Sequence, residues 1–347
     1  MHELIIIGGG AIGLFLAKEF AQKGKSVLLL EKKDKIGSKV CSGLVSRNIF
    51  KYIPEKDIVS FCEGKINGAK LWIGEKQFFF KGKALLLNRN KFDNYLFEEA
   101  KKSGVEIVLG QRIINILEKD NFVKIFSEDG KIFKGKILAG CDGAVSLTAK
   151  KVGLPTQKKL LLGVVTYLKR NEEKNEKFVE LFFSKKIPGF FIWKIPREKK
   201  DEWGIALRQD QNPRKILEDF LREKNLKILS PKAALIPYFP LKKTITKRVF
   251  LCGDSAGQIK PYTGGGIIYG FECAKIAADT IRDFATPNLG KYEREWEKSL
   301  MKKIYFGNFI RRCYYSPNLI KKIALFLLNK RKNIDQDNPF SIFNYNI

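Results

Sequence analysis

The chain has 347 residues, of which 65 are Lys or Arg and 37 are Asp or Glu, giving a formal net charge of +28. Its single histidine, His2, excludes a Ser-His-Asp triad and argues against a histidine-based metal site. No apolar run reaches the eighteen or so residues needed to span a bilayer, so we expect a soluble or peripheral protein.

The lysines are spread along the chain rather than clustered, which indicates that composition supplies much of the charge. Such a positive field favours an anionic membrane surface. We expect no specific nucleic-acid partner, because no RNA-recognition signature accompanies the charge. The six cysteines contain no CxxC pair, which is typical of reduced thiols in a cytoplasmic protein.

A glycine-rich segment follows the first apolar run, Leu4–Ile7, which we expect to be a strand buried on both faces. Gly8 allows a sharp turn, Gly10 lets the backbone approach a pyrophosphate, and Gly13 lets the next helix pack on the sheet. A helix from Ala11 to about Lys23 would direct its N–H groups at the phosphates. The pattern predicts a dinucleotide site.

An acid stands where this kind of site needs one. A second strand, Ser26–Leu30, ends at Glu31, about twenty residues beyond the glycines. There its carboxylate can accept hydrogen bonds from ribose hydroxyls. It also argues against a 2′-phosphate, because two anions would repel each other.

The middle of the chain mixes strands with one clear helix. Residues 66–87 predict β-hairpins with turns at Gly68, Gly74 and Gly82. A helix runs from Asn88 to about Ser103, and a helix also begins near Ser46. Further strands are expected at 105–109, 113–118, 122–127 and 137–140, then at 161–169, 178–183, 190–195 and 203–208.

A second glycine-rich segment lies near the other end of the chain. The strand 248–251 leads into Gly253–Gly257, and Pro261–Gly266 precedes a helix from about Ile267 to Phe284. Two such motifs in one chain indicate FAD, held by both ends of the sequence. The residues after Phe284 predict helices, with a frayed tail over the last dozen.

Together these landmarks resemble the FAD-dependent oxidoreductases of the p-hydroxybenzoate-hydroxylase fold class, and more closely the geranylgeranyl reductase family, from Leu4 to about Phe284. The resemblance implies an α/β fold: a three-layer Rossmann-like FAD/NAD(P)-binding domain, an antiparallel-sheet substrate domain and C-terminal helices. We expect the FAD-binding domain in residues 1–60, 83–153 and 245–288, the substrate domain in 61–82 and 154–244, and the helical region in 289–347.

The resemblance assigns FAD contacts to the first glycine loop, the acid after the second strand, an arginine opening a helix, an Asp-Gly pair and the second glycine segment. These are Gly8, Gly10, Ala11, Ile12, Gly13, Glu31, Arg89, Asp142, Gly143, Asp254, Gly264, Gly265, Gly266 and Ile267. Lys39–Gly43 resembles the family's cysteine loop, which puts Cys41 beside the flavin; Ser42 stands where that loop usually has glycine.

The substrate wall is predicted from an aromatic strand. Phe191-Ile192-Trp193-Lys194-Ile195-Pro196 resembles the family's Tyr-x-Trp-x-Phe-Pro motif, with Phe191, Trp193 and Pro196 as candidate isoprenoid contacts. An ordinary packed strand would read the same way. The segment is also close to the Trp-x-Trp-x-Ile-Pro signature of flavin-dependent halogenases.

The function expected from this resemblance is FAD-dependent hydrogenation of carbon–carbon double bonds in geranylgeranyl chains of archaeal-type ether-lipid precursors. Cys41, Tyr262 or water would donate the proton, and ferredoxin or NAD(P)H would supply electrons. Two alternatives stay open: a flavin-dependent monooxygenase or halogenase acting on an aromatic or apolar molecule, and a non-catalytic flavin- and lipid-binding protein.

The last helices raise a separate question. Ser316-Pro317-Asn318 predicts a helix start, followed by an apolar cluster with flanking basic residues: Lys321, Lys322, Lys330, Arg331 and Lys332. Such a segment can lie in a membrane interface or pack on the core. We expect a monomer in the cytoplasm, peripheral on the cytoplasmic face of the membrane.

Overall fold

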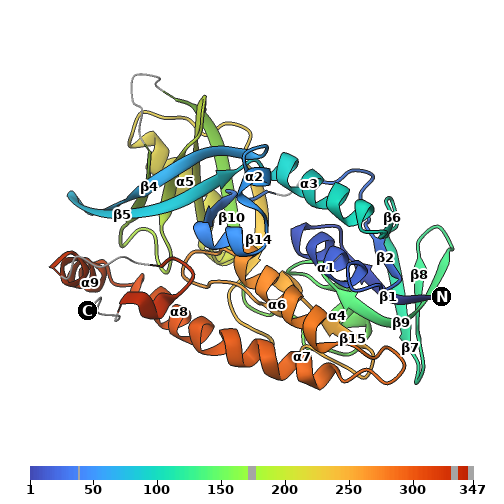
Figure 1. Cartoon of the computed structure of the whole chain (residues 1–347). Helices are drawn as coiled ribbons and strands as arrows, with labels where there is room; N and C mark the ends of the chain where they lie inside the picture. Colours follow the sequence, from blue (N-terminus) through green and yellow to red (C-terminus); the bar gives the residue numbers. More distant parts are fainter. Residues whose placement is uncertain (38–39, 171–176, 330–334, 343–347) are drawn as a thin grey trace.

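Two β-sheets organise the chain, with helices packed along both (Figure 1). The computed structural model describes residues 1–37, 40–170, 177–329 and 335–342. Each sheet gathers strands from distant parts of the sequence, so the site between them draws on almost the whole chain.

The first sheet has 7 strands in the order β6-β2-β1-β9-β8-β7, and β15 also pairs with β9. Its parallel members are β1 (His2–Ile7), β2 (Val27–Leu30), β6 (Glu106–Val108), β9 (Ile132–Gly140) and β15 (Val249–Leu251). β7 (Ile113–Glu118) and β8 (Val123–Ser127) join β9 as an antiparallel meander. The central strand β1 is buried on both faces, as its unbroken apolar run predicts.

Three helices pack on one face of this sheet: α1 (Ala11–Ala21), α3 (Arg89–Lys102) and α6 (Ile267–Thr280). Phe15 of α1 stacks on Phe271 of α6 with ring centroids 4.1 Å apart. On the other face, Ile5 and Leu28 pack against apolar side chains of β7 and β8. This is the predicted three-layer arrangement.

The second sheet has 8 strands in the order β14-β10-β13-β12-β11-β4-β5-β3. They are β3 (Leu44–Ser46), β4 (Cys62–Ile73), β5 (Lys76–Leu87), β10 (Leu160–Lys169), β11 (Phe178–Phe183), β12 (Ile192–Pro196), β13 (Lys200–Leu207) and β14 (Lys232–Pro237). Neighbours are antiparallel except β11 and β4, which pair in parallel. The domain limits drawn from the sequence stay a prediction.

The residues 66–87 form one long hairpin rather than several. Its turn contains Gly74 (φ 61°), whereas Gly68 and Gly82 lie inside β4 and β5. Gly68 marks a register shift between the two strands, so it bends the ladder without ending it. The helix expected from Ser46 is a 3-10 turn, Arg47–Lys51, with Ser46 as its N-cap.

The remaining helical elements are short. α5 (Pro213–Arg222), which the sequence analysis missed, buries Leu217 and Leu221 against the second sheet. The others are α2 (Glu55–Ile58), α4 (Leu147–Lys151) and the 3-10 turns Gln209–Gln211, Gly253–Ala256 and Pro339–Ile342.

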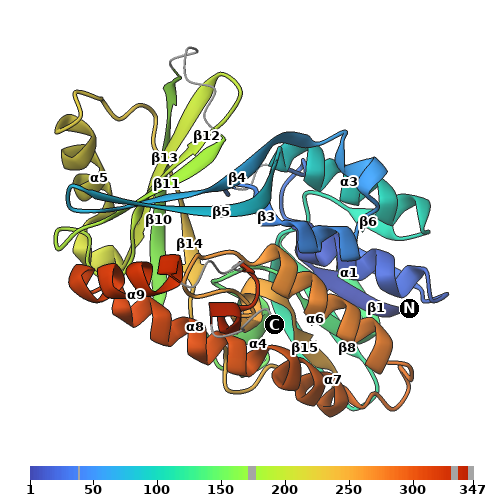
Figure 2. The ribbon, with the colours of Figure 1, turned by 60° about the vertical axis from the view of Figure 1, so that its left-hand side comes forward.

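The chain ends in helices that run beside both sheets. They are α7 (Leu289–Trp296), a π-helical segment Glu297–Met301, α8 (Lys302–Cys313) and α9 (Pro317–Asn329). Figure 2 shows α7 near the first sheet and α9 near the second. Within the described residues, none of the helices has the length and apolar character to cross a bilayer.

The predicted frayed tail is wrong for residues 336–342. Asp337 is 6% exposed, and Phe340 stacks on Phe306 of α8 with centroids 4.7 Å apart. The segment is held by side chains from distant parts of the chain, which local composition cannot reveal. The tail residues 343–347, and Lys39, Lys330, Arg331 and Lys332, lie outside the described residues.

Candidate functional site

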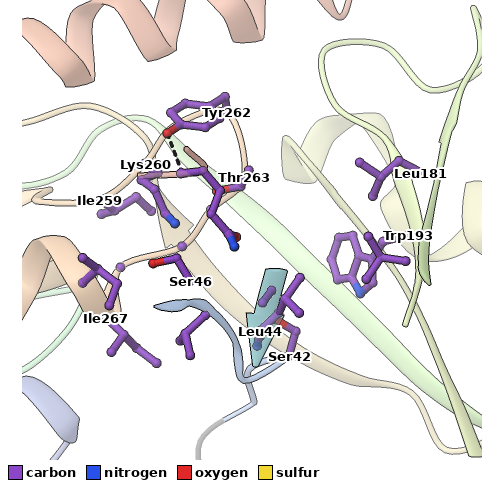
Figure 3. Close-up of a pocket in the computed structure, with 18 of the residues that line it drawn as sticks. Ser42, Leu44, Ser46, Leu181, Trp193, Ile259, Lys260, Tyr262, Thr263 and Ile267 are labelled. Atoms are coloured by element: carbon purple, nitrogen blue, oxygen red, sulfur yellow. Dashed lines mark hydrogen bonds between the residues drawn. The ribbon is translucent and has the colours of Figure 1, made fainter. Parts of the chain in front are cut away.

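A cavity of about 940 Å³ is lined by strands of the second sheet, by segments that follow strands of the first sheet and by the C-terminal helices. Figure 3 shows Lys260, Tyr262 and Thr263 on one wall, with Leu181 and Trp193 across from them. The predicted residues that line it are Gly10, Ala11, Ile12, Cys41, Arg89, Gly143, Phe191, Trp193, Asp254, Tyr262, Gly264, Gly265, Gly266 and Ile267. Gly8, Gly13, Glu31, Asp142 and Pro196 do not line it.

The first glycine loop has the shape of a phosphate cradle. Gly8 has φ 112°, and a Cβ at Gly13 would lie 2.0 Å from the Gly8 carbonyl oxygen, so the turn and the start of α1 are pressed together. A Cβ at Gly10 would meet no protein atom within 4 Å. The backbone at Gly10 is therefore open to a ligand at the N-terminus of α1.

Glu31 stabilises this loop from outside the cavity lining. One carboxylate oxygen accepts the Gly9 N–H at 2.6 Å and the other accepts the Lys33 N–H at 3.0 Å. The carboxylate therefore holds the loop, while its remaining lone pairs can still accept from a ribose. That second role stays a prediction.

Arg89 brings a buried positive charge to the cavity. Asn88 caps α3, and the Arg89 guanidinium donates to both carboxylate oxygens of Asp93, at 2.8 and 2.9 Å. Burial alone would lower the pKa of Arg89, but its interactions with Cys41 and Asp93 raise it above the ordinary value. The guanidinium is a fixed cation that suits an anionic cofactor.

The second glycine segment forms the facing part of the cradle. The Lys260 N–H donates to the Gly265 carbonyl at 3.0 Å, and the Gly264 N–H donates to the Lys260 carbonyl at 2.8 Å. A Cβ at Gly266 would lie 2.8 Å from a carboxylate oxygen of Asp254. Helix α6 begins next, so its N-terminus adjoins the cavity at Ile267.

The Asp-Gly pair divides between two places. Gly143 lines the cavity, whereas Asp142 accepts hydrogen bonds from the Ser146 hydroxyl at 2.6 Å and the Thr148 N–H at 2.8 Å. Burial raises the pKa of Asp142 despite these bonds. In this structure Asp142 thus anchors the start of α4.

The aromatic strand forms the far wall. The Trp193 indole N–H donates to Glu202 at 3.1 Å, and a Cβ at the cross-strand residue Gly204 would lie 2.3 Å from the indole ring. Gly204 therefore leaves the space in which the ring lies against the sheet. Phe191 and Leu181 extend this apolar wall.

The two candidate proton donors both reach the cavity. The Gly43 N–H points at the Cys41 sulfur at 3.5 Å. Tyr262 is buried and donates its hydroxyl to the Gln336 carbonyl at 2.8 Å. Burial, together with Tyr269 and Asp337, raises the pKa of Tyr262 well above its ordinary value, which makes it a weak acid.

A buried ionic network that the sequence analysis missed ties the cysteine loop to the second sheet. Arg197 donates to the Ser42 carbonyl at 2.6 Å and to Glu202 at 2.7 Å, and it pairs with Glu63. Glu202 is completely buried. The sequence carried no clear signal for it, because Glu202 ends the charged run 197–202. Only the structure shows that the Glu202 charge is buried and needs a partner.

The C-terminal helices also contribute wall residues that the sequence analysis did not place in the site. These apolar side chains are Phe306, Phe309 and Ile310 of α8 and Leu319, Ile323 and Phe326 of α9. The open Gly10 backbone, the buried Arg89 cation and the α6 N-terminus fit a dinucleotide cofactor at one end of the cavity. The rest of its wall is mostly apolar.

Gly10→Val should abolish FAD binding while leaving the chain folded, because the new side chain enters the open cradle instead of colliding with protein atoms. The measurement is bound flavin absorbance after desalting, alongside far-UV circular dichroism. Gly64→Val in β4, which also meets no atom within 4 Å, is the matched control and should stay yellow. A Gly10→Val protein with full flavin content would refute the cradle.

Arg197→Met should lower the free energy of unfolding by about 3–5 kcal/mol, because it leaves buried Glu202 without its cation. Chemical denaturation measures the change. Lys186→Met removes an exposed pair with Glu223 and should leave the midpoint unchanged. Equal midpoints for both variants would show that the network does not stabilise the fold by tying the cysteine loop to the second sheet.

Proteins of archaea resemble this chain over most of its length. A digeranylgeranylglycerophospholipid reductase of Methanothermobacter thermautotrophicus is 27% identical, covering 87% of this chain and 85% of its own. A digeranylgeranylglycerophospholipid reductase of Methanocaldococcus jannaschii is 28% identical, and the match covers 86% of this chain and 83% of that protein.

Solved structures show the same fold. A geranylgeranyl bacteriochlorophyll reductase-like protein from Thermoplasma acidophilum superposes with a TM-score of 0.86 at 19% identity, covering 99% of this chain and 94% of its own. PqsL from P. aeruginosa, in complex with 2-aminobenzoylacetate, gives 0.76 at 14% identity, covering 92% and 98%.

Two family matches bear on the cofactor. Residues 3–76 match the FAD dependent oxidoreductase family, and residues 79–272, more than half of the chain, match the FAD binding domain family. Both matches include residues that line the cavity. The chain therefore belongs to the FAD binding domain family and is an FAD-dependent oxidoreductase.

Proposed function

We propose that this flavoprotein hydrogenates carbon–carbon double bonds in geranylgeranyl chains of archaeal-type ether lipids. The observation that carries the proposal is one cavity in which the FAD loops continue into an apolar, aromatic wall. An isoprenoid offers only apolar surface and π-bonds, and such a wall can bind both. The names of the archaeal relatives support the same substrate class.

Bound FAD, once reduced, supplies hydride chemistry. The chain's own task is to hold an unactivated alkene against the cofactor and to keep water away. Apolar side chains of β11, β12, α8 and α9 surround the cavity for this purpose. Arg197 holds the Ser42 carbonyl and so fixes the loop that carries Cys41.

Cys41 is the proton donor we favour. Its thiol carries a proton that can be donated, and Cys41 lines the cavity. Tyr262 is the weaker candidate, because its proton is engaged by the Gln336 carbonyl and burial raises its pKa. Ordered water is the third.

The decisive experiment titrates dithionite-reduced protein with a geranylgeranyl lipid, anaerobically. Reoxidation of the flavin coupled to a saturated product is the expected result. No turnover would favour a flavin- and lipid-binding protein, and oxygen-dependent hydroxylation or halogenation of an aromatic compound would favour the monooxygenase alternative. Repeating the turnover with reduced ferredoxin or NAD(P)H identifies the electron donor.

Cys41→Ser should reduce turnover at least tenfold with FAD content unchanged, because Cys41 lines the cavity while the cradle residues hold the cofactor. Single-turnover flavin reoxidation measures the rate, and the 450 nm absorbance measures the content. Cys62→Ser, a half-buried thiol outside the cavity lining, is the control and should react at the wild-type rate. Equal rates for all three proteins would remove Cys41 as the donor.

We propose further that α8 and α9 meet the cytoplasmic face of an anionic membrane. The inner side of α9 packs on the second sheet through Ile320 and Ala324, while Leu325 is 45% exposed and Tyr305 of α8 is 57% exposed. Lys321 and Lys322 lie on α9. An apolar surface with neighbouring lysines suits a lipid interface.

Replacing Tyr305 and Leu325 together by Asp should abolish co-sedimentation with anionic vesicles, because it puts two anions on the apolar face. FAD content should not change. Val59 and Ile132 are 75% and 60% exposed elsewhere on the molecule, so their double Asp variant is the matched control. Point variants are preferred, because a chain truncated after Arg312 would also lose the buried residues Ile320 and Asp337. Equal sedimentation of both double variants would exclude this face of α8 and α9 as the membrane contact.

A further inference from the structure

A buried ion pair lies beside the second glycine segment. The Lys260 ammonium is 2.6 Å from an Asp337 carboxylate oxygen, and the two side chains are 6% and 7% exposed. Neither residue was singled out by the sequence analysis. The pair joins the second glycine segment to a residue 77 positions later, so it is a long-range tertiary contact rather than a local one.

Lys260 belongs to the loop that faces the cofactor site. Its backbone closes the turn through bonds to Gly264 and Gly265, and a Cβ at Gly265 would lie 3.3 Å from its ammonium nitrogen. Lys260 lines the cavity. Figure 3 shows its side chain extending from the loop toward Ser46.

Asp337 is held from several sides. Ser46 donates its hydroxyl to the carboxylate, and the Asn48 amide donates to it at 2.8 Å. The Tyr269 hydroxyl donates to the Asp337 carbonyl at 2.9 Å. Burial alone would raise the pKa of Asp337, but Lys260, Ser46 and Asn48 together lower it by more, so the net pKa lies below its ordinary value. The carboxylate is therefore ionised at neutral pH.

We propose that Lys260 and Asp337 form a matched charge pair that sets the reduction potential of the bound FAD. The reduced flavin carries a negative charge, so Lys260 stabilises it and Asp337 opposes that stabilisation. In a buried site the removal of either partner leaves the other uncompensated. The other charged residues that line the cavity are the same in every variant: Arg47, Lys81, Lys83, Arg89, Asp254 and Asp335.

This inference goes beyond the proposed function and rests only on FAD being the cofactor. Its test needs no lipid substrate. If the potential does not shift as expected, the proposal of double-bond reduction still stands. If the protein does not turn over the lipid, the proposal for the charge pair still stands.

The experiment measures the midpoint potential of the bound flavin by redox titration against a reference dye. The potential of Lys260→Met, measured at pH 8.5, should be more negative than that of wild type at the same pH. The potential of Asp337→Asn, measured at pH 6.5, should be more positive than that of wild type at the same pH. A tenfold change in the reduction equilibrium corresponds to about 30 mV for two electrons, and we expect at least that. The double variant should return close to wild type.

Tyr269→Phe is the control for a structural effect, because it removes the bond to the Asp337 carbonyl without changing charge. Its potential should equal that of wild type. If one single variant loses FAD, the other single variant and the double variant still differ by one charge and carry the test. Shifts of the same sign in both single variants, or no shift with FAD bound, would overturn the proposal.

Discussion

The close approach of Gly13 to the Gly8 carbonyl is the constraint on which the rest of the site depends. Any side chain at Gly13 would collide with that oxygen, because a Cβ there would lie 2.0 Å away. Glycine lets α1 start directly above the end of β1. The same turn brings Gly8 close to the carbonyl of Cys141, the residue that follows the neighbouring strand β9, so the cradle and the sheet edge form together.

A second constraint follows from building the site between two sheets. The apolar wall is useful only if it stays at a fixed position relative to the FAD loops. Arg197 supplies such a tie by joining Ser42 to Glu202, and Asp337 supplies another by joining Ser46 to Lys260. Both ties are buried charges with several hydrogen-bond partners, which gives them direction as well as strength.

The sequence predicted what depends on short-range pattern. β1, α1, β2 and Glu31 follow from an apolar run, glycine spacing and a terminal acid, and the structure has them in that order. Gly68 was misread as a turn because the same residue also serves a bulge. Asp337 was misread as tail because its partner Ser46 is 291 residues away, and no local pattern records such a contact.

The chemistry of the cavity follows from how few polar side chains it contains. For the alkene substrate that we propose, electrostatic groups aimed at the double bond would gain little and would bring water with them. Arg89, Asp254 and the Lys260–Asp337 pair lie at the cofactor end, whereas aromatic and aliphatic side chains make up most of the remaining wall, which also includes Lys81 and Lys83 of β5. In the reaction that we propose, such a division would control the reduced cofactor through charge and the substrate through shape. Substrate specificity should then reside in the walls of α8, α9 and β12, whereas the driving force should reside in the glycine segments and their ionic neighbours.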